Sequence, residues 1–265
     1  MGFADLHIHT VYSWDGTCTV PAVLKYAADV AGLDVIAITD HDCITGALEA
    51  IQLAPRYGID VIPGCEVTTA DGHLLALFIQ KPIPAGRSLV ETVLLVGEQG
   101  GICIAAHPGA RVKTSLSHRV IRSALQEPGI SQVLVGIEGF NAGLIYSQSN
   151  QAAYKLAGDL SLAKVGSSDS HVLETIGWGS TEFAGFFRDN LRHALERKAT
   201  RVVFGHRSSG LDKISRWVPR ILLRRMGWVT TNRSPHGPIQ MGRLVPPKRG
   251  LVGEPTLAPE HVHSL

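Results

Sequence analysis

Short apolar runs alternate along this 265-residue chain with longer segments in which apolar side chains recur at helical spacing. The short runs predict strands, and the amphipathic segments between them predict helices. The expected strands are 3–8, 35–39, 60–66, 73–79, 101–106, 133–138, one ending near Gly166, and 201–204. The expected helices are 20–31, 44–57, one beginning at Ser88, 116–126, 151–157 and 186–198. This alternation predicts a parallel, barrel-like α/β fold.

Local signals mark the ends of several helices. Thr19 precedes Pro21 as a candidate N-cap. Ser88 and Glu91 have the spacing of a capping box. Pro55 is expected to strain or end the second helix, because a proline removes a helical hydrogen bond.

The pattern changes after about residue 206. Apolar and basic residues alternate at roughly helical spacing over 213–228, with an interruption at Pro219, and the chain beyond Gly227 is expected to lack fixed structure. Residues 206–265 hold 10 Lys or Arg against 3 Asp or Glu, whereas residues 1–205 hold 15 against 20. We therefore predict a domain over 1–205 and a basic C-terminal extension over 206–265, partly helical and then irregular.

Composition narrows the class of protein. Hydrophobic residues make up 45% of the chain and charged residues 18%, which favours a globular protein over a disordered one. No apolar run approaches the ~18 to 20 residues that span a bilayer, and cleavage of a signal peptide would remove His7 and His9. The four cysteines have no paired spacing, which predicts reduced thiols in a cytoplasmic protein.

Five segments end an apolar run in residues that bind metals. His7 and His9 are two positions apart on an expected strand, so both imidazoles face the same side. The other four segments end in Asp40-His41-Asp42, Glu66, His107 and Asp169-Ser170-His171. In barrel-like α/β folds the loops after the strands build the active site. His73 departs from this pattern because it begins its apolar run.

Together these segments resemble the polymerase and histidinol phosphatase (PHP) family of metal-dependent phosphoesterases. The motifs, in the family's order, are Asp5-Leu6-His7-Ile8-His9-Thr10, Ser13-Trp14-Asp15-Gly16, Ile38-Thr39-Asp40-His41-Asp42, Gly64-Cys65-Glu66, His73, Ala106-His107-Pro108 and Ser168-Asp169-Ser170-His171. The resemblance covers residues 4 to about 205 and implies a distorted (β/α)7 barrel. Only 34 positions separate His73 from His107, so the helical insertion of many nucleotide-cleaving members is absent.

The resemblance also implies two or three divalent metal ions. It implies one ion on His7, His9, Glu66 and Asp169, a second on Glu66, His73 and His107, and a third on Asp15, His41 and His171. Imidazoles and carboxylates without thiolates suit Mn, Fe or Zn in an open, catalytic site. A water between two such ions loses a proton near neutral pH and becomes the nucleophile for attack on phosphorus.

The remaining candidate residues concern catalysis and the substrate. Asp40, His41 and His171 are the candidate catalytic residues, and Asp40 either orients a ligating histidine or caps a strand end. Arg111 and Lys113 are candidates for binding a phosphate, unless they belong to a solvated loop. Two further candidates follow a strand end and are predicted to contact a ribose or base from the rim of the site: Glu138 and Asn141.

The expected substrate is a small phosphorylated metabolite, such as a 3′,5′-bisphosphonucleotide or the end of a short oligonucleotide. Histidinol phosphate is the closest alternative, although histidinol phosphatases commonly have a histidine where this chain has Asp15. A noncatalytic PHP binding module is the alternative from another class.

The basic extension has three interpretations: a helix docked on the barrel or in an oligomer, a helix bound peripherally to anionic lipid through Arg216, Arg220, Arg224 and Arg225, or a nucleic-acid contact.

Overall fold

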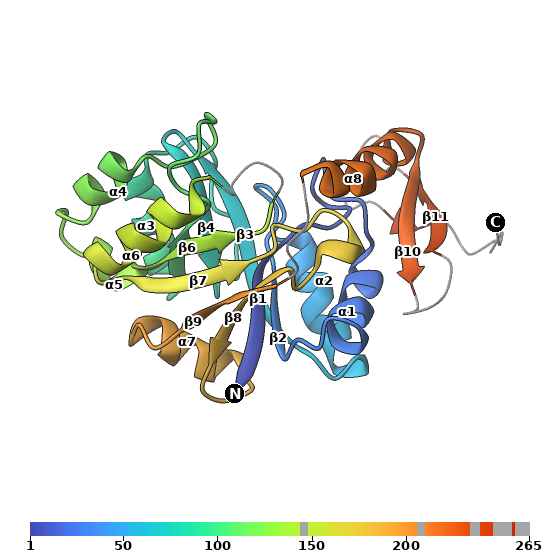
Figure 1. Cartoon of the computed structure of the whole chain (residues 1–265), viewed down its shortest axis with the longest axis horizontal. Coiled ribbons are helices and arrows are strands. Elements are labelled where there is room, and N and C mark those ends of the chain that lie inside the picture. Colours follow the sequence, from blue (N-terminus) through green and yellow to red (C-terminus); the bar gives the residue numbers. More distant parts are fainter. Residues whose placement is uncertain (144–147, 206–209, 234–238, 246–255, 258–265) are drawn as a thin grey trace.

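The computed structural model describes residues 1–143, 148–205, 210–233, 239–245 and 256–257. Nine strands form one curved sheet in the order β7-β6-β5-β4-β3-β2-β1-β8-β9 (Figure 1). They are β1 (Gly2–Ile8), β2 (Val35–Ile38), β3 (Asp60–Thr69), β4 (Gly72–Leu77), β5 (Ile102–Ala105), β6 (Leu134–Asn141), β7 (Ala163–Ser167), β8 (Gly179–Phe183) and β9 (Arg201–Phe204).

The sheet curls until its edges meet and forms a nearly closed barrel. The strand β7 at one edge lies against β1, β8 and β9. The hydroxyl of Thr181 in β8 joins the edges, because it accepts from the Gly166 N–H at 3.0 Å and donates to the Gly166 carbonyl at 2.9 Å. Most strands run parallel as predicted, but β4, β8 and β9 pair antiparallel. We did not predict β8, since its sequence Gly-Ser-Thr-Glu-Phe contains no apolar run.

Helices cover the outside of the sheet and close one end of the barrel. They are α1 (Val20–Asp29), α2 (Thr45–Leu53), η1 (Ala54–Arg56), α3 (Leu89–Glu98), α4 (His118–Ala124), α5 (Ile130–Val133), α6 (Asn150–Asp159), η2 (Leu173–Thr175), α7 (Arg188–Glu196) and α8 (Gly210–Arg225). The capping box of Ser88 and Glu91 is confirmed at the start of α3. Helix α2 gives way to the 3-10 turn η1 at Pro55, as expected.

Two buried apolar clusters stabilise the barrel. The larger lies between the sheet and its covering helices and includes Leu24 of α1 and Ile36 of β2. The smaller includes Leu6, Leu75 and Phe183 and receives side chains from α7. Because α7 touches β3, β6 and β8, it lies across one end of the barrel. The opposite end is left for polar side chains.

The C-terminal extension is more ordered than predicted. Strands β10 (Trp228–Arg233), β11 (Ile239–Val245) and β12 (Thr256–Leu257) form an antiparallel sheet, which corrects the expectation that the chain beyond Gly227 is irregular. Helix α8 continues through Pro219 without the predicted interruption, although the proline removes one N–H donor, and the helix packs against β10.

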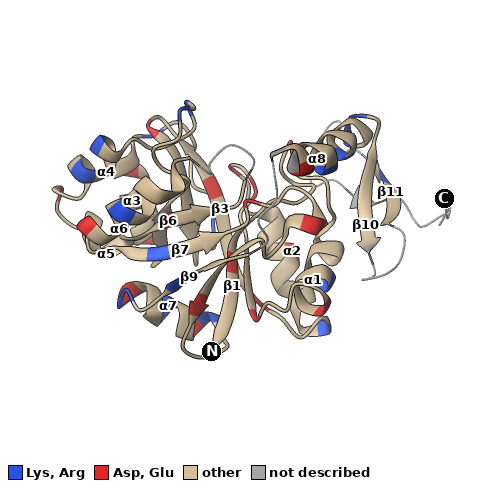
Figure 2. Ribbon diagram, viewed as in Figure 1, with Lys and Arg blue, Asp and Glu red and all other residues tan. Residues whose placement is uncertain are grey.

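The extension packs against the barrel beside α1 (Figure 1). Thr230 of β10 exchanges main-chain hydrogen bonds with Thr17 and Thr19 at 2.9 and 3.0 Å. Arg220 of α8 pairs with Glu174 at 3.2 Å. Figure 2 shows that further Lys and Arg residues lie along α8. The described residues thus agree with the docked-helix interpretation, whereas a lipid or nucleic-acid contact and the boundary at residue 205 stay predictions.

None of the described helices is both long and apolar enough to cross a membrane.

Candidate metal centre

The open end of the barrel gathers the predicted ligands from strands that are far apart in the sequence. His7 lies in β1 and His9 directly follows it, Glu66 lies in β3, His107 follows β5, and Asp169 follows β7. All five side chains are buried. His107 and Asp169 have positive φ angles of 30° and 52°, a conformation that non-glycine residues adopt at a cost and that turns these side chains toward the centre.

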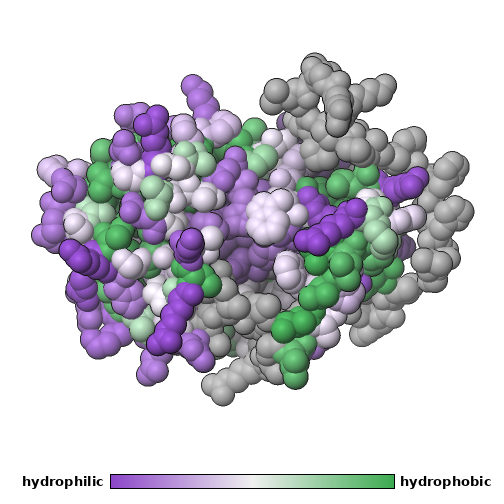
Figure 3. All heavy atoms as spheres, turned by 90° about the horizontal axis from the view of Figure 1, so that it is seen from above, coloured by the Kyte–Doolittle hydropathy of each residue, from purple (hydrophilic) through white to green (hydrophobic). Residues whose placement is uncertain are grey.

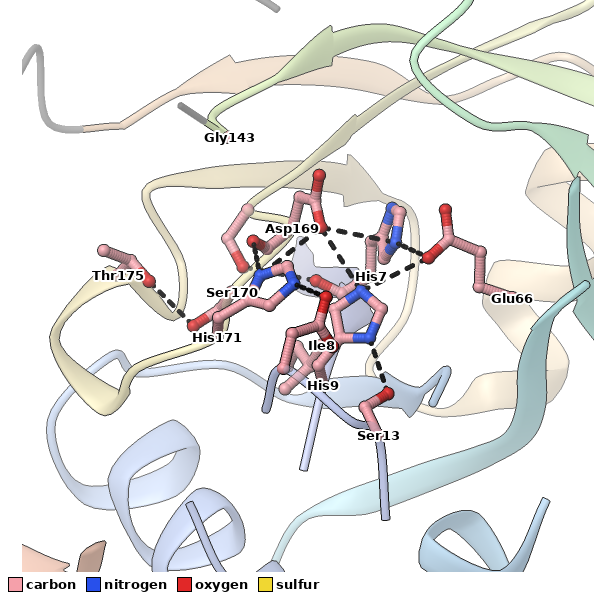
Figure 4. A network of polar contacts seen from close by, with 12 residues as sticks. His7, Ile8, His9, Ser13, Glu66, Gly143, Asp169, Ser170, His171 and Thr175 are labelled. Carbon is pink, nitrogen blue, oxygen red and sulfur yellow. Dashed lines mark hydrogen bonds and ion pairs between the residues drawn. The ribbon is translucent and has the colours of Figure 1, made fainter. Parts of the chain in front are cut away.

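The first cluster joins His7, His9, Glu66 and Asp169 (Figure 4). His7 Nε2 lies 3.2 Å from Glu66 Oε2 and 3.5 Å from Asp169 Oδ1. His9 Nε2 lies 3.4 Å and 3.3 Å from the same two oxygens. Two imidazoles and two carboxylates therefore converge on one point, as the resemblance implied.

The second cluster uses the other oxygen of Glu66. Oε1 lies 2.7 Å from His73 Nδ1 and 3.0 Å from His107 Nε2. His73 reaches this position although it begins its strand, because β4 pairs antiparallel with β3 and Thr68 lies opposite His73. The carboxylate of Glu66 thus lies between the first and second clusters.

The third cluster lies around Asp15, between the loop after β1 and the loop after β7. Asp15 Oδ2 is 3.0 Å from His171 Nε2 and 3.3 Å from His41 Nε2. His41 Nδ1 is also 3.1 Å from Glu66 Oε2. The structure therefore brings together all nine predicted ligands, and His9 also lies within reach of the third group.

The donor atoms fit divalent metal ions. Three overlapping groups of imidazole nitrogens and carboxylate oxygens have their donor atoms within 4.8 Å of one another. They are His7, His9 and Glu66; His41, Glu66 and His73; and His9, Asp15, His41 and His171. Among the described residues, His7 Nε2, His9 Nε2 and Glu66 Oε2 are buried and have no hydrogen-bond partner. Buried polar atoms are rarely left in this state, so these three atoms are suited to share an ion.

The pKa shifts reflect the same crowding of charge. Burial opposes protonation of His7, but Asp169, Glu66 and Glu138 outweigh it and raise the pKa of the imidazole. Burial alone would raise the pKa of Glu66, yet the neighbouring histidines hold it well below its usual range. For His9, burial and the charge of His171 lower the pKa to about 4. Protons and metal cations thus compete for the same atoms.

Glu138 lies behind the first cluster, not at the rim where we predicted it. The side chain is fully buried. It contacts His7 Nδ1 at 2.9 Å, accepts from the His107 main-chain N–H at 2.7 Å, and accepts from Ser167 Oγ. Asn141 donates to Glu138 at 2.9 Å and to Asp169 at 3.3 Å. Both side chains therefore orient the predicted ligands.

Asp40 does not touch a ligating histidine directly. It accepts from the main chain of Thr10 at 2.6 Å and from its hydroxyl at 2.7 Å, and burial raises its pKa to about 6. Ser13 makes the contacts expected of Asp40, because its hydroxyl lies 3.0 Å from His9 Nδ1 and accepts from the His41 N–H at 2.8 Å. Ser13 belongs to the quoted motif, but spacing alone gave it no role.

A cavity of about 350 Å³ opens above the three clusters. Figure 3 shows a hydrophilic recess on this face, with apolar surface beside it. Besides the ligands, the wall includes Trp14, Thr114 and Trp217. Arg111 and Lys113 are exposed and are not part of the described wall, so their contact with a substrate stays a prediction.

The barrel and its clustered ligands define a metal-dependent hydrolase of phosphate esters. The chain belongs to the PHP family, since the model of the PHP domain matches residues 5–176. A two-domain Bacteroides vulgatus protein, described as containing a predicted PHP-like metal-dependent phosphoesterase, shares the fold with a TM-score of 0.62 and 20% identity over 92% of this chain and 76% of its own.

Three sequence relatives were compared with the chain. An uncharacterized protein of Methanocaldococcus jannaschii is 36% identical over 52% of this chain and 81% of its own. The 3′,5′-nucleoside bisphosphate phosphatase of Chromobacterium violaceum is 39% identical over 32% of this chain and 30% of its own. The phosphoribosyl 1,2-cyclic phosphate 1,2-diphosphodiesterase of Eggerthella lenta is 35% identical over 34% of this chain and 36% of its own. The last two alignments span about a third of each enzyme.

Proposed function

We propose that this protein hydrolyses the phosphate ester of a nucleotide, such as a 3′,5′-bisphosphonucleotide, or the end of a short oligonucleotide. The observation that carries the proposal is the position of Glu66, whose two oxygens lie within 3.4 Å of histidines from separate clusters. A carboxylate shared in this way is suited to bridge two cations.

The nine residues would hold the ions as the family resemblance implies. His7, His9, Glu66 and Asp169 form the first set, Glu66, His73 and His107 the second, and Asp15, His41 and His171 the third. When bound, Mn, Fe or Zn ions in such sites supply a nucleophile at neutral pH and neutralise the charge of the phosphate.

The side chains of the protein prepare the site for an anion. Glu138 fixes the ring of His7, and Ser13 fixes that of His9, so neither imidazole needs to reorient when a ligand arrives. Burial opposes the charge of His171, but Asp15 overcomes this and raises its pKa to about 9. His171 lines the cavity together with His41, and both would hold the third ion there, so that this ion would meet the phosphate oxygens.

Two relatives support a phosphorylated nucleoside or sugar as the substrate. The Chromobacterium enzyme is a nucleoside bisphosphate phosphatase, and the Eggerthella enzyme is a phosphoribosyl cyclic phosphate phosphodiesterase. Asp15 argues against histidinol phosphate for the reason given above. The convergence of all nine ligands argues against a noncatalytic binding module.

The proposal is tested by chromatography of products from the Mn-loaded protein and one mixed panel. The panel holds nucleoside monophosphates, 3′,5′-bisphosphonucleotides, histidinol phosphate and short 5′-phosphorylated oligonucleotides. We expect selective loss of a nucleotide or of terminal residues. Consumption of histidinol phosphate alone, or of nothing by protein with bound metal, would contradict the proposal.

Two variants link any activity to the metal centre. We expect His9→Ala to reduce phosphate release by about 10³-fold, since metal ions contribute several kcal/mol to such reactions. His193 is exposed on α7, so His193→Ala is the matched control and should retain activity. Full activity of a cleanly purified, folded His9→Ala protein would exclude the proposed chemistry.

A further inference from the structure

Two tryptophan rings border the cavity at the end formed by the third cluster. The Trp14 ring lies 5.9 Å from the His41 ring and is nearly parallel to it, with an angle of 14°. The Trp217 ring lies 6.3 Å from the His171 ring at 85°. Because both histidines contact Asp15, the two indoles lie beside the same part of the wall.

Trp14 presents its ring to solvent from a fixed backbone. Its side chain is 71% exposed, which is unusual for the largest apolar residue type. Its carbonyl oxygen nevertheless accepts from Arg224 Nε at 3.1 Å, and the neighbouring Ser13 contacts His9. An exposed ring on a held backbone loses little conformational freedom when a flat ligand packs on it.

Trp217 comes from the C-terminal extension and has an unused donor. Its indole Nε1 is buried and has no hydrogen-bond partner within the part of the chain that the structure describes. Buried indole N–H groups usually have one. Helix α8 is held in place by the Arg220 pair with Glu174, so Trp217 is a stable part of the wall.

We propose that Trp14 and Trp217 form an aromatic subsite that stacks the base of a nucleoside phosphate while its phosphate lies at the metal clusters. This inference rests on the proposed function and names the recognition elements for its substrate. Rings of tryptophan stack on every nucleobase, because each base has a π face. Because stacking tolerates any base, we expect the two rings to distinguish a nucleotide from a base-free phosphate, not one base from another.

The test compares two ligands that cannot be hydrolysed. One is the phosphonate analogue of AMP, in which a methylene group replaces the ester oxygen, and the other is the same analogue of ribose 5-phosphate, which lacks the base. Affinities are measured by calorimetry on the Mn-loaded full chain. We expect Trp14→Ala and Trp217→Leu each to weaken the AMP analogue by about 5- to 100-fold, and to change the ribose analogue less than about twofold.

Trp228 provides the matched control. It lies on β10 in the same extension and is not part of the described wall, so Trp228→Leu should bind both analogues as the unmodified protein does. If Trp217→Leu does not fold, Trp14→Ala alone decides, because an exposed ring can be removed without loss of core packing. Equal weakening of both analogues, or no weakening, would overturn the subsite.

The outcomes separate the subsite from the proposed chemistry. Unmodified protein that binds both analogues equally and releases phosphate from a base-free ester would overturn the subsite and retain the hydrolysis. Tryptophan-dependent binding of the AMP analogue would support the subsite even if no ester of the panel were hydrolysed, a result that would contradict the hydrolysis alone.

Discussion

Arg224 donates from Nε to the carbonyl oxygen of Trp14 at 3.1 Å, across 210 positions of the chain. The same guanidinium donates through Nη2 to the carbonyls of Val11 and Ser13. These three carbonyls belong to the loop that leads to Asp15. The last turn of α8 therefore holds the loop that supplies a predicted ligand of the third cluster.

We expect Arg224→Gln to loosen this loop. Hydrogen bonds from charged donors contribute about 1.5 to 3 kcal/mol each, so the loss of several should lower the free energy of unfolding by about 2 kcal/mol or more. The bound Mn per chain should also fall as Asp15 becomes mobile. Urea unfolding and elemental analysis measure the two effects. Arg225→Gln is the control, since Arg225 is exposed on the same helix; equal behaviour of both variants would contradict the role of Arg224.

Glu138→Gln should weaken metal binding while preserving the fold. Glu138 contacts His7 Nδ1 at 2.9 Å, and a neutral amide there orients and polarises the imidazole less strongly. Loss of such a supporting carboxylate typically costs about 10- to 100-fold in metal affinity. Competition with a metal-sensitive dye measures the change. Glu127→Gln, at an exposed position, should bind as the unmodified protein does, and an unaltered affinity in Glu138→Gln would show that the contact has no role in binding.

Removal of metal should lower thermal stability. The ligands are buried and crowded, so ions that bind only the folded state stabilise it by about 2.7 kcal/mol at a concentration 100 times the dissociation constant. For a chain of this size that corresponds to roughly 5 to 10 °C in Tm. Calorimetry before and after dialysis against a chelator, and again with Mn restored, measures the shift. Asp169→Ala should shift less, and a Tm independent of metal would argue against the centre.

Alkylation should distinguish the four cysteines. Burial raises the pKa of Cys18 to about 12 and raises those of Cys65 and Cys103 as well, so few thiolates form there at pH 8. Cys43 is only partly buried. We expect iodoacetamide to modify Cys43 alone in the folded protein and all four thiols in urea, as read by peptide mass spectrometry. Rapid modification of Cys103 in the folded protein would contradict this packing.

The sequence by itself determined the barrel class and the side chains that gather at the open end of the barrel. Residues such as His7, His9 and Glu66 follow apolar runs, and the ends of strands in a barrel meet at one edge. Local signals were equally informative at Ser88, where the capping box depends on residues three positions apart. These features could be predicted because each is encoded within a few neighbouring residues or in the order of the motifs.

Only the tertiary structure decided which side chains support the ligands and what covers the cavity. Glu138 contacts His7 from 131 positions away, and its direction depends on closure of the barrel, which brings β7, the neighbour of β6, against β1; no periodicity reports this. The C-terminal extension likewise depends on packing against the loop after β1. Thr230 of β10 bonds to Thr17 and Thr19, and Arg224 of α8, the helix that carries Trp217, bonds to Trp14. Contacts of this range arise from the closure of the barrel and from the packing of the extension on it, so they leave no local pattern in the sequence.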